Sequence, residues 1–290
     1  MSLINYVSVL RVKQWLKNFL LFFPAFFSLS IFQHGVLFQL LLLTIGFSFI
    51  ASSVYIFNDL SDVVGDALHP QKKNKPITAG KIGKKQALIY AVILFALGLT
   101  LSTFIYFSSI YFLLLYVFIN VVYSLWAKHI PILDIVLVST GFLIRIYLGA
   151  WAVGVAVSWW LSSLIFLMAI YILIAKRKDD VLCFQQHQIA PRKHIHFYNK
   201  VNFSIVLYGL SILIILLYSF YTFSDVTTHL FKSDYLWLTI PLAALGIFSF
   251  THSVIKTNSH FEPISLILNH KVILLTLILW MSLFGWLIYG

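Results

Sequence analysis

The chain has 290 residues, of which 61% are hydrophobic and only 10% are charged. About a quarter of the residues in an ordinary soluble domain are charged, so this composition excludes a soluble protein and predicts an integral membrane protein. The formal net charge of +11 does not indicate nucleic-acid binding, because the basic residues collect in the loops between apolar runs, as the positive-inside rule expects.

Nine apolar runs of about 20 residues follow one another along the chain, each long enough to cross the hydrocarbon core of a bilayer. They predict an all-α, polytopic membrane bundle of nine transmembrane helices. No long hydrophilic stretch interrupts them, so residues 1–290 are expected to form one membrane domain. The first run lacks a small-residue cleavage site, which favours a retained helix over a signal peptide. The predicted spans are 18–34, 36–57, 86–106, 109–127, 131–151, 157–175, 201–221, 235–254 and 270–289.

The distribution of lysine and arginine predicts the orientation of these spans. Three basic residues precede the first span, six lie between residues 58 and 85, and six lie between residues 176 and 200. Three more fall on the same side, whereas only Lys232 lies in a loop on the opposite side. Because such residues accumulate in cytoplasmic loops, the N-terminus is predicted to be cytoplasmic and the C-terminus to lie outside. We therefore expect a multi-pass protein of the cell (inner) membrane with its active site facing the cytoplasm.

Four polar residues at the end of the second span carry the strongest chemical signal. Asn58, Asp59, Asp62 and Asp66 form the pattern N-D-x-x-D-x-x-x-D. Steps of three and four residues place the three carboxylates along one stripe of an α-helix, where they repel one another unless a cation neutralises them. Carboxylate oxygens are ligands of Mg²⁺, which in turn holds substrate phosphates. The stripe predicts a magnesium–diphosphate site at the membrane surface; the alternative is a solvated acidic helix face.

Basic residues from two cytoplasmic loops are candidates for phosphate contacts. The segment after the aspartates contains His69 and Pro70 and then Lys72, Lys73 and Lys75. Four spans later, and on the same predicted side, the string KRKDD follows an apolar run and contains Lys176, Arg177 and Asp180. An arginine can hold a phosphate through two parallel hydrogen bonds. The alternative for any one of these lysines is an anchor at the membrane surface.

Two further basic sites lie outside those loops. Arg145 falls inside a predicted span, where an arginine usually faces a cavity or a partner; the candidates are an anionic substrate or a structural contact to another helix. Lys17 lies with Arg11, Lys13 and Asn18 around Trp15, which fits either an interfacial anchor or a contact to a lipid phosphate. The motifs of zinc proteases, serine hydrolases and P-loop enzymes are absent from the sequence, which favours Mg²⁺-assisted departure of a diphosphate.

Four strings together resemble the UbiA superfamily of intramembrane prenyltransferases, and within it the decaprenyl-phosphate phosphoribosyltransferase branch. They are LRVKQWLKN, YIFNDLSDVVGDALHPQKKNKPITAG, YSLWAKHIPILDIVLVSTGFLIR and IAKRKDD. The resemblance implies a nine-helix fold and transfer of 5-phosphoribose from phosphoribosyl diphosphate to a polyprenyl phosphate, with release of diphosphate. Aromatic prenyltransferases of the superfamily carry a second D-x-x-x-D for another Mg²⁺ where this chain has KRKDD.

The resemblance also implies roles for individual residues. The three aspartates would hold Mg²⁺ and the diphosphate, Asn58 would orient them, and Asp180 would contact the ribose or the metal. The implied phosphate contacts are Lys17, Lys73, Lys75, Arg145, Lys176 and Arg177.

Two other functions stay open at this stage. One is an aromatic prenyltransferase of the same fold, which the missing second aspartate motif disfavours. The other is a transporter or lipid-binding protein, suggested by Arg145 and the many spans. The length of the prenyl chain and the oligomeric state are not indicated, because lipid-facing and subunit-facing apolar surfaces look alike.

Overall fold

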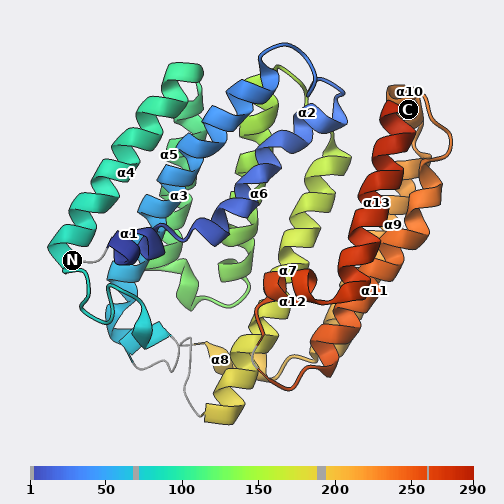
Figure 1. Ribbon diagram of the computed structural model, residues 1–290. Helices are drawn as coiled ribbons and strands as arrows, with labels where there is room; N and C mark the ends of the chain where they lie inside the picture. The colour runs from blue at the N-terminus through green and yellow to red at the C-terminus, as the bar shows by residue number, and fades with distance from the viewer. Residues whose placement is uncertain (1–2, 68–71, 188–193, 260) are drawn as a thin grey trace. The chain divides into compact units, whose positions relative to one another are not determined.

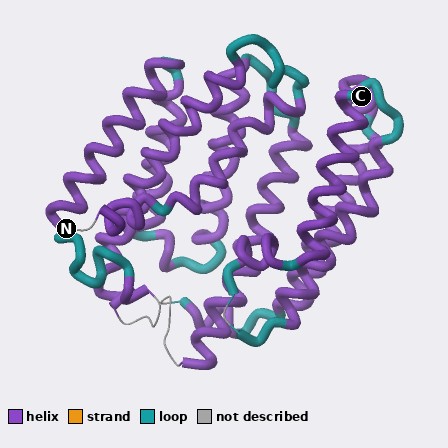
Figure 2. Tube along the Cα trace, viewed as in Figure 1, coloured by secondary structure: helices purple, strands orange, loops and turns teal. Residues whose placement is uncertain are grey.

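The computed structural model describes residues 3–67, 72–187, 194–259 and 261–290, and every regular element in these ranges is a helix (Figures 1 and 2). The helices form two compact units, Met1–Val157 and Ser158–Gly290. Each unit is described by itself below. The all-α class is thereby confirmed, whereas the single membrane domain over 1–290 stays a prediction.

Among the residues that the structure describes, seven helices are long and apolar enough to cross a membrane, and the protein is a multi-pass membrane protein. In unit 1 these are α3 (Val36–Ala67), α4 (Lys84–Ile105) and α6 (Leu133–Val153). In unit 2 they are α7 (Trp159–His187), α9 (Phe203–Phe223), α11 (Ile240–Lys256) with the short η4 (Leu236–Thr239) before it, and α13 (Lys271–Tyr289). The helix α5 (Ser109–Leu125) is apolar but shorter, with 17 residues.

The count of nine spans is not confirmed, and the region of the first predicted span differs most. Instead of one long α-helix over 18–34, the structure has a 3₁₀ helix, η1 (Val12–Phe22), followed by the five-residue α2 (Phe23–Phe27). Two side chains of η1 bind α3: Trp15 Nε1 donates to Ser52 Oγ (3.0 Å) and Asn18 Nδ2 donates to Ser48 Oγ (2.8 Å). A 3₁₀ helix rises about 2 Å per residue, so η1 extends roughly 22 Å despite its eleven residues.

The remaining elements are short and lie at helix ends or in loops. In unit 1 they are α1 (Leu3–Leu10), η2 (Lys72–Asn74) and η3 (Ala127–His129). In unit 2 they are α8 (Ile195–Asn199), α10 (Asp225–Phe231) and α12 (Pro263–Asn269).

The centre of unit 1 is α3, which contacts α1, η1, α4, α5 and α6. In its apolar stretch 61% of the residues are buried, against 22% for α4. Helices α3 and α4 cross closely, since a Cβ added to Gly98 would lie 2.5 Å from the carbonyl oxygen of Gly46. Small residues at such crossings let helix backbones approach closely in a bilayer. This packing holds the end of α3, which carries the aspartate motif, on a rigid support.

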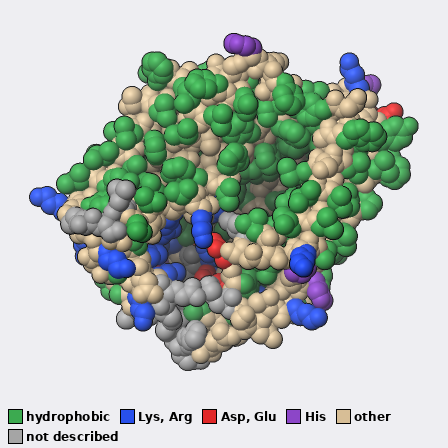
Figure 3. Space-filling view, viewed as in Figure 1, with side chains coloured by type: hydrophobic (Ala, Val, Ile, Leu, Met, Phe, Trp, Pro, Cys, Tyr) green, Lys and Arg blue, Asp and Glu red, His purple; other side chains and the backbone are tan. Residues whose placement is uncertain are grey.

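In unit 2, α7 and α11 pack against α9, and α13 packs against α11. Polar side chains cross-link three of these helices. The hydroxyl of Tyr171 donates to the carbonyl of Ile247 (3.0 Å) and lies 2.5 Å from Thr251 Oγ1, which lies 2.7 Å from Ser211 Oγ. Buried hydroxyls in a bilayer need such partners because no water is available. The outward faces of the helices in both units are densely hydrophobic (Figure 3).

The close crossing of α3 and α4 leads to a stability prediction. Gly98→Ala should lower the free energy of unfolding by about 1–3 kcal/mol, because the new methyl group overlaps the backbone of α3. Thermal unfolding of the purified protein in detergent measures the effect. Gly209→Ala in α9 is the matched control, since nothing lies within 4 Å of its added Cβ. Equal melting temperatures for the two variants would contradict this account of the crossing.

Candidate active site

The aspartate motif lies on the last turns of α3, which continues past its apolar stretch. With 32 residues, α3 is roughly 48 Å long, whereas the hydrocarbon core of a bilayer is about 30 Å thick. The apolar sequence ends at Phe57, so the final helical turns extend into the polar region at the membrane surface. The predicted helical stripe is confirmed as helix. The motif is therefore part of the helix itself rather than of the loop expected over 58–85.

Two of the three carboxylates converge on one cation. Lys75 Nζ lies 2.7 Å from Oδ1 of Asp59 and 2.5 Å from Oδ2 of Asp66. Both aspartates are buried, with 4% and 6% of their surface exposed. The guanidinium of Arg11 also donates to Oδ1 of Asp59, at 2.5 Å. The helical stripe thus becomes a chain of alternating charges, Arg11–Asp59–Lys75–Asp66, in which each carboxylate is neutralised.

The third carboxylate has its own cation and an amide donor. Asp62 accepts a hydrogen bond from Lys128 Nζ (2.5 Å) and another from Asn58 Nδ2 (3.0 Å). The amide oxygen of Asn58 in turn accepts from Ser124 Oγ on α5 (2.9 Å). These contacts fix the position of the Asn58 side chain and aim its amide group at the middle aspartate.

Two of the three aspartates at this site are placed so that they could share one divalent cation. Within the described ranges no group of three or more His, Cys, Asp or Glu side chains is arranged around one point as a metal site. Asp59 and Asp66 nevertheless converge on the ammonium group of Lys75, which stands where a shared cation would bind. Mg²⁺ commonly uses one or two carboxylates and completes its shell with substrate phosphates and water. The pair therefore supplies two protein ligands, and Asp62, the third carboxylate of the motif, is bound to Lys128 and Asn58.

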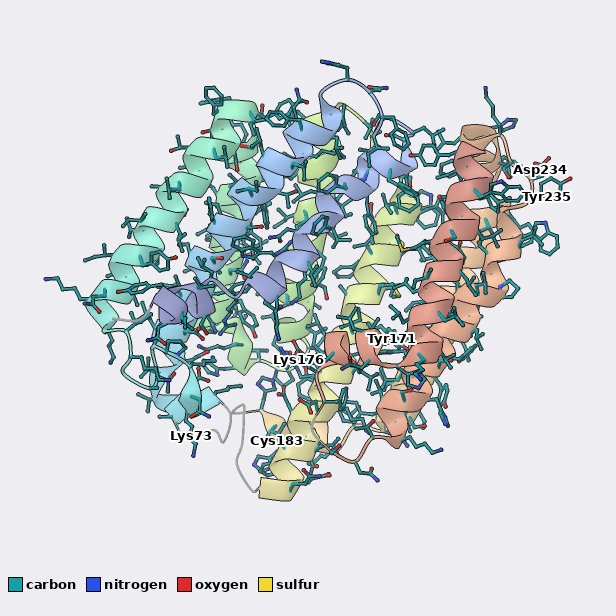
Figure 4. The ribbon with its side chains drawn as sticks, viewed as in Figure 1. Lys73, Tyr171, Lys176, Cys183, Asp234 and Tyr235 are labelled. Atoms are coloured by element: carbon teal, nitrogen blue, oxygen red, sulfur yellow. The ribbon has the colours of Figure 1, made fainter. Side chains whose placement is uncertain are left out.

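Lys73 and Lys17 are two other predicted phosphate contacts of unit 1. Lys73 is exposed and points away from the helices (Figure 4). Lys17 is half-buried, with its ammonium 6.0 Å from the centre of the Phe142 ring. His69 and Pro70 lie outside the described residues.

Arg145 is buried inside unit 1, with 3% of its surface exposed. Its Nε donates to Oδ1 of Asn18 (2.8 Å), and its two terminal nitrogens donate to the carbonyl of Gly141 (2.5 Å) and the hydroxyl of Tyr116 (3.3 Å). The guanidinium also lies over the ring of Phe47, 4.7 Å from its centre. This arrangement joins η1, α3, α5 and α6 by hydrogen bonds and a cation–π contact.

The level of Arg145 along α3 can be placed through Asn18, which also donates to Ser48. Ser48 precedes Asp59 by eleven residues, which is roughly 16 Å along a helix. The structure does not bring Arg145 together with the aspartates of α3, and a phosphate contact for it stays a prediction.

In unit 2, the string KRKDD continues α7 as helix instead of opening a loop, and its charged side chains have distinct contacts. Arg177 is 1% exposed, and its guanidinium donates to Oδ2 of Asp180 at 2.6 Å. The same guanidinium lies 6.0 Å from the centre of the Tyr198 ring on α8. Lys176 is exposed (Figure 4). Arg177 and Asp180 thus form an ion pair one turn apart on α7.

The other two residues of the string bind the backbone of neighbouring segments. Lys178 Nζ donates to the carbonyls of Val254 (2.6 Å), Ile255 (3.0 Å) and Thr257 (2.8 Å), at the C-terminal end of α11. Asp179 Oδ1 accepts from the backbone N–H of Phe261 (2.9 Å). A cation at this position satisfies carbonyls that have no partner within the helix and faces the negative end of the helix dipole.

Sequence reasoning missed two members of the aspartate cluster. The sequence patterns place Arg11 at the membrane interface, and they mark Lys128 only as one of the three further basic residues on the cytoplasmic side. A weak signal existed for both, since they fall in the strings LRVKQWLKN and YSLWAKHIP that carry the family resemblance. Arg11 also has a left-handed backbone (φ 53°, ψ 48°), a conformation that costs a non-glycine residue about 1–3 kcal/mol and is often found at functional sites.

A model of the UbiA prenyltransferase family matches residues 21–260. The chain belongs to this family. Decaprenyl-phosphate phosphoribosyltransferase of Corynebacterium glutamicum is 27% identical over 280 residues, covering 94% of this chain and 83% of the relative. The protein of the same name from Mycolicibacterium smegmatis is 25% identical and covers 98% of this chain and 92% of its own length.

A solved structure supports the UbiA fold. A UbiA homolog from Archaeoglobus fulgidus, bound to GPP and Mg²⁺, is similar with a TM-score of 0.72 and 20% identity, covering 99% of this chain and 100% of that chain. At this level of identity the likeness establishes the fold of the UbiA family for this chain and nothing about its substrates.

The contacts of KRKDD predict separate effects for two lysines of unit 2. Lys178→Met should lower the free energy of unfolding by about 1–3 kcal/mol, because three carbonyls at the end of α11 lose a charged donor. Lys200→Met removes the same charge from an exposed position and should leave the melting temperature within about 1 °C. Thermal unfolding in detergent compares the two, and a larger loss for Lys200→Met would contradict the capping role.

The contacts of Arg145 predict a large effect on stability when they are removed. Arg145→Gln should destabilise the protein by roughly 3 kcal/mol, since it removes the hydrogen bonds of a charged donor to three groups. Arg145→Lys should restore only part of this loss, because an ammonium cannot reproduce the planar fork of donors. Melting temperatures are to be measured together with the affinity for labelled diphosphate. A lost affinity with unchanged melting would instead favour the predicted phosphate contact.

Proposed function

We propose that this protein is a Mg²⁺-dependent polyprenyl-phosphate phosphoribosyltransferase. The observation that carries the proposal is the convergence of Asp59 and Asp66 on one cationic position at the membrane-surface end of α3. Such a position suits a metal-bound diphosphate next to a lipid headgroup. The names of the relatives from Corynebacterium and Mycolicibacterium support phosphoribosyl diphosphate as the donor and a decaprenyl-phosphate-like lipid as the acceptor.

In the proposed reaction an oxygen of the lipid phosphate attacks C1 of the ribose, and the bond from C1 to the diphosphate oxygen breaks. The electron pair of that bond leaves with the diphosphate, and the product is a polyprenyl phosphoribose phosphodiester. The lipid phosphate is already ionised at neutral pH, so the reaction needs no side chain to remove a proton from the nucleophile. A bound Mg²⁺ would stabilise the negative charge that develops on the leaving diphosphate.

The side chains of the chain have positioning roles in this scheme. Asp59, Asp62 and Asp66 hold the metal, with Asn58 orienting Asp62. The proposed phosphate contacts are Lys17, Lys73, Lys75, Arg145, Lys176 and Arg177, and Asp180 serves the ribose or the metal. The proposed site faces the cytoplasm, with the N-terminus on that side of the inner membrane, as the distribution of basic residues suggests.

A second candidate is an aromatic prenyltransferase that uses a prenyl diphosphate. Membership of the UbiA prenyltransferase family is compatible with this option. The residues of KRKDD disfavour it, because only Asp179 and Asp180 are acidic there, and they bind the Phe261 backbone and Arg177. Family membership favours either enzyme over a transporter.

Purified full-length protein tests the two enzymes directly. In one reaction it receives Mg²⁺, phosphoribosyl diphosphate labelled in the ribose, and polyprenyl phosphates of several chain lengths. In the other it receives a labelled prenyl diphosphate and an aromatic acid. We expect label in the lipid fraction of the first reaction and no prenylated aromatic product in the second. The reverse pattern would identify the protein as a prenyltransferase, and no transfer to any lipid phosphate would reject the proposal.

Asp62→Asn tests the catalytic role of the motif. The Asp62 side chain is 30% exposed and its ion pair with Lys128 lies near the surface, so its loss should change the free energy of unfolding by less than about 1 kcal/mol. Transfer activity should fall at least about a hundredfold, because Asp62 would help to hold the metal that stabilises charge on the leaving diphosphate, and loss of such stabilisation has effects of that size. Asp234→Asn is the control, since Asp234 is exposed in unit 2, between α10 and η4 (Figure 4). Unfolding of Asp62→Asn, or full activity, would contradict the assignment.

A further inference from the structure

The ion pairs at the end of α3 balance in charge. Three carboxylates pair with three cationic side chains, so the cluster has a formal charge of zero, although three aspartates on one helix face would suggest an open acidic site. The six residues all lie in unit 1: Asp59, Asp62 and Asp66 with Arg11, Lys75 and Lys128.

Lys75 holds the central position in this cluster. Its ammonium lies 2.7 Å and 2.5 Å from oxygens of Asp59 and Asp66, which are themselves buried. A Mg²⁺ held by the same two carboxylates would need the space that the ammonium occupies. The ammonium and the metal cannot occupy this position together, because their charges repel and their volumes overlap. Any divalent cation that binds the aspartate pair must therefore displace Lys75.

The displaced ammonium needs a new anionic partner. A free divalent cation brings none, so its binding leaves Lys75 without a counter-ion beside a new positive charge. A metal–diphosphate complex brings several anionic oxygens that can accept the ammonium. The exchange conserves the number of charge pairs only in this second case, and leaving one member of a partly buried charge pair without its partner is strongly destabilising.

We infer that Lys75 is an internal counter-ion that keeps the aspartate pair closed to free divalent cations and moves to the diphosphate when metal and diphosphate bind together. This inference rests on one part of the proposed function, the binding of a diphosphate. It does not depend on the lipid acceptor. It assigns two successive partners to one lysine, carboxylates in the empty site and phosphate oxygens in the loaded site.

Arg11 supports this exchange by holding Asp59 from a second direction. It shares Oδ1 of Asp59 with Lys75, at 2.5 Å, and its guanidinium lies over the Tyr55 ring at 5.3 Å. The hydroxyl of Ser52 donates to the carbonyl of Leu10 (2.8 Å), directly before the left-handed residue, and so fixes the backbone there. Asp59 therefore keeps a partner when Lys75 leaves, and its carboxylate stays in position for the metal.

The test uses Lys75→Gln in the full-length protein in detergent, with two separate probes. Free Mn²⁺ alone is titrated and its binding followed by electron paramagnetic resonance, and labelled inorganic diphosphate is titrated by equilibrium dialysis at fixed Mn²⁺. The variant should bind free Mn²⁺ about tenfold more tightly than the wild type, and Mn²⁺–diphosphate about tenfold more weakly, since allosteric and linked effects of this size are common for one charged group. A purely structural lysine would not change the two affinities in opposite directions.

Two further variants complete the test. Lys81→Gln makes the same change at an exposed position of the same loop and should match the wild type with both probes. Lys75→Arg keeps the positive charge and should restore weak binding of free Mn²⁺, which also serves if Lys75→Gln folds poorly. Unchanged or weaker binding of free Mn²⁺ by Lys75→Gln, or unchanged diphosphate binding, would overturn the inference.

The binding experiments can fail independently of the transfer assay that tests the proposed function. Opposite shifts of the two affinities without phosphoribosyl transfer would retain the counter-ion and reject the lipid acceptor. Transfer by the wild type, with Lys75→Gln binding free Mn²⁺ no more tightly, would retain the proposed function and reject the counter-ion.

Discussion

The aspartate stripe of α3 can exist only if cations neutralise it, and this requirement organises much of unit 1. Carboxylates three and four residues apart on a helix repel one another. The structure satisfies the requirement with side chains from three other segments: Arg11 after α1, Lys75 after η2, and Lys128 in η3. The charged pairs tie these segments to the end of α3, so the folding of the loops and the electrostatics of the candidate site depend on the same contacts.

The bilayer imposes a second constraint, which explains the polar contacts deeper in each unit. A buried donor or acceptor in the membrane has no water to replace its partner, and Arg145 and Tyr171 are each surrounded by hydrogen-bond partners. Helices there also approach closely through glycine, as Gly46 and Gly98 do between α3 and α4. The rigid helices produced in this way carry their charged ends at fixed positions, as a site that binds a diphosphate requires.

Basic residues that look alike in the sequence make different contacts in the structure. Lys178 caps the end of α11, and Arg177, next to it, pairs with Asp180. Lys75 binds two carboxylates, whereas Lys73, two residues earlier, is exposed. A positive charge near a membrane surface therefore does not by itself identify a phosphate contact, and each lysine must be judged by the groups within hydrogen-bond distance of its ammonium.

The sequence alone determined the helical class, most of the spans and the common face of the three aspartates, because hydrophobic length and helical periodicity are local properties. It also indicated Lys75 as a basic residue beside the aspartates, because they are close in the chain. The 3₁₀ form of η1 and the partners of each aspartate were decided only by the tertiary structure. Arg11 and Lys128 reach Asp59 and Asp62 across 48 and 66 residues, and no periodicity in the sequence encodes which distant cation meets which carboxylate, since that depends on how the helices pack.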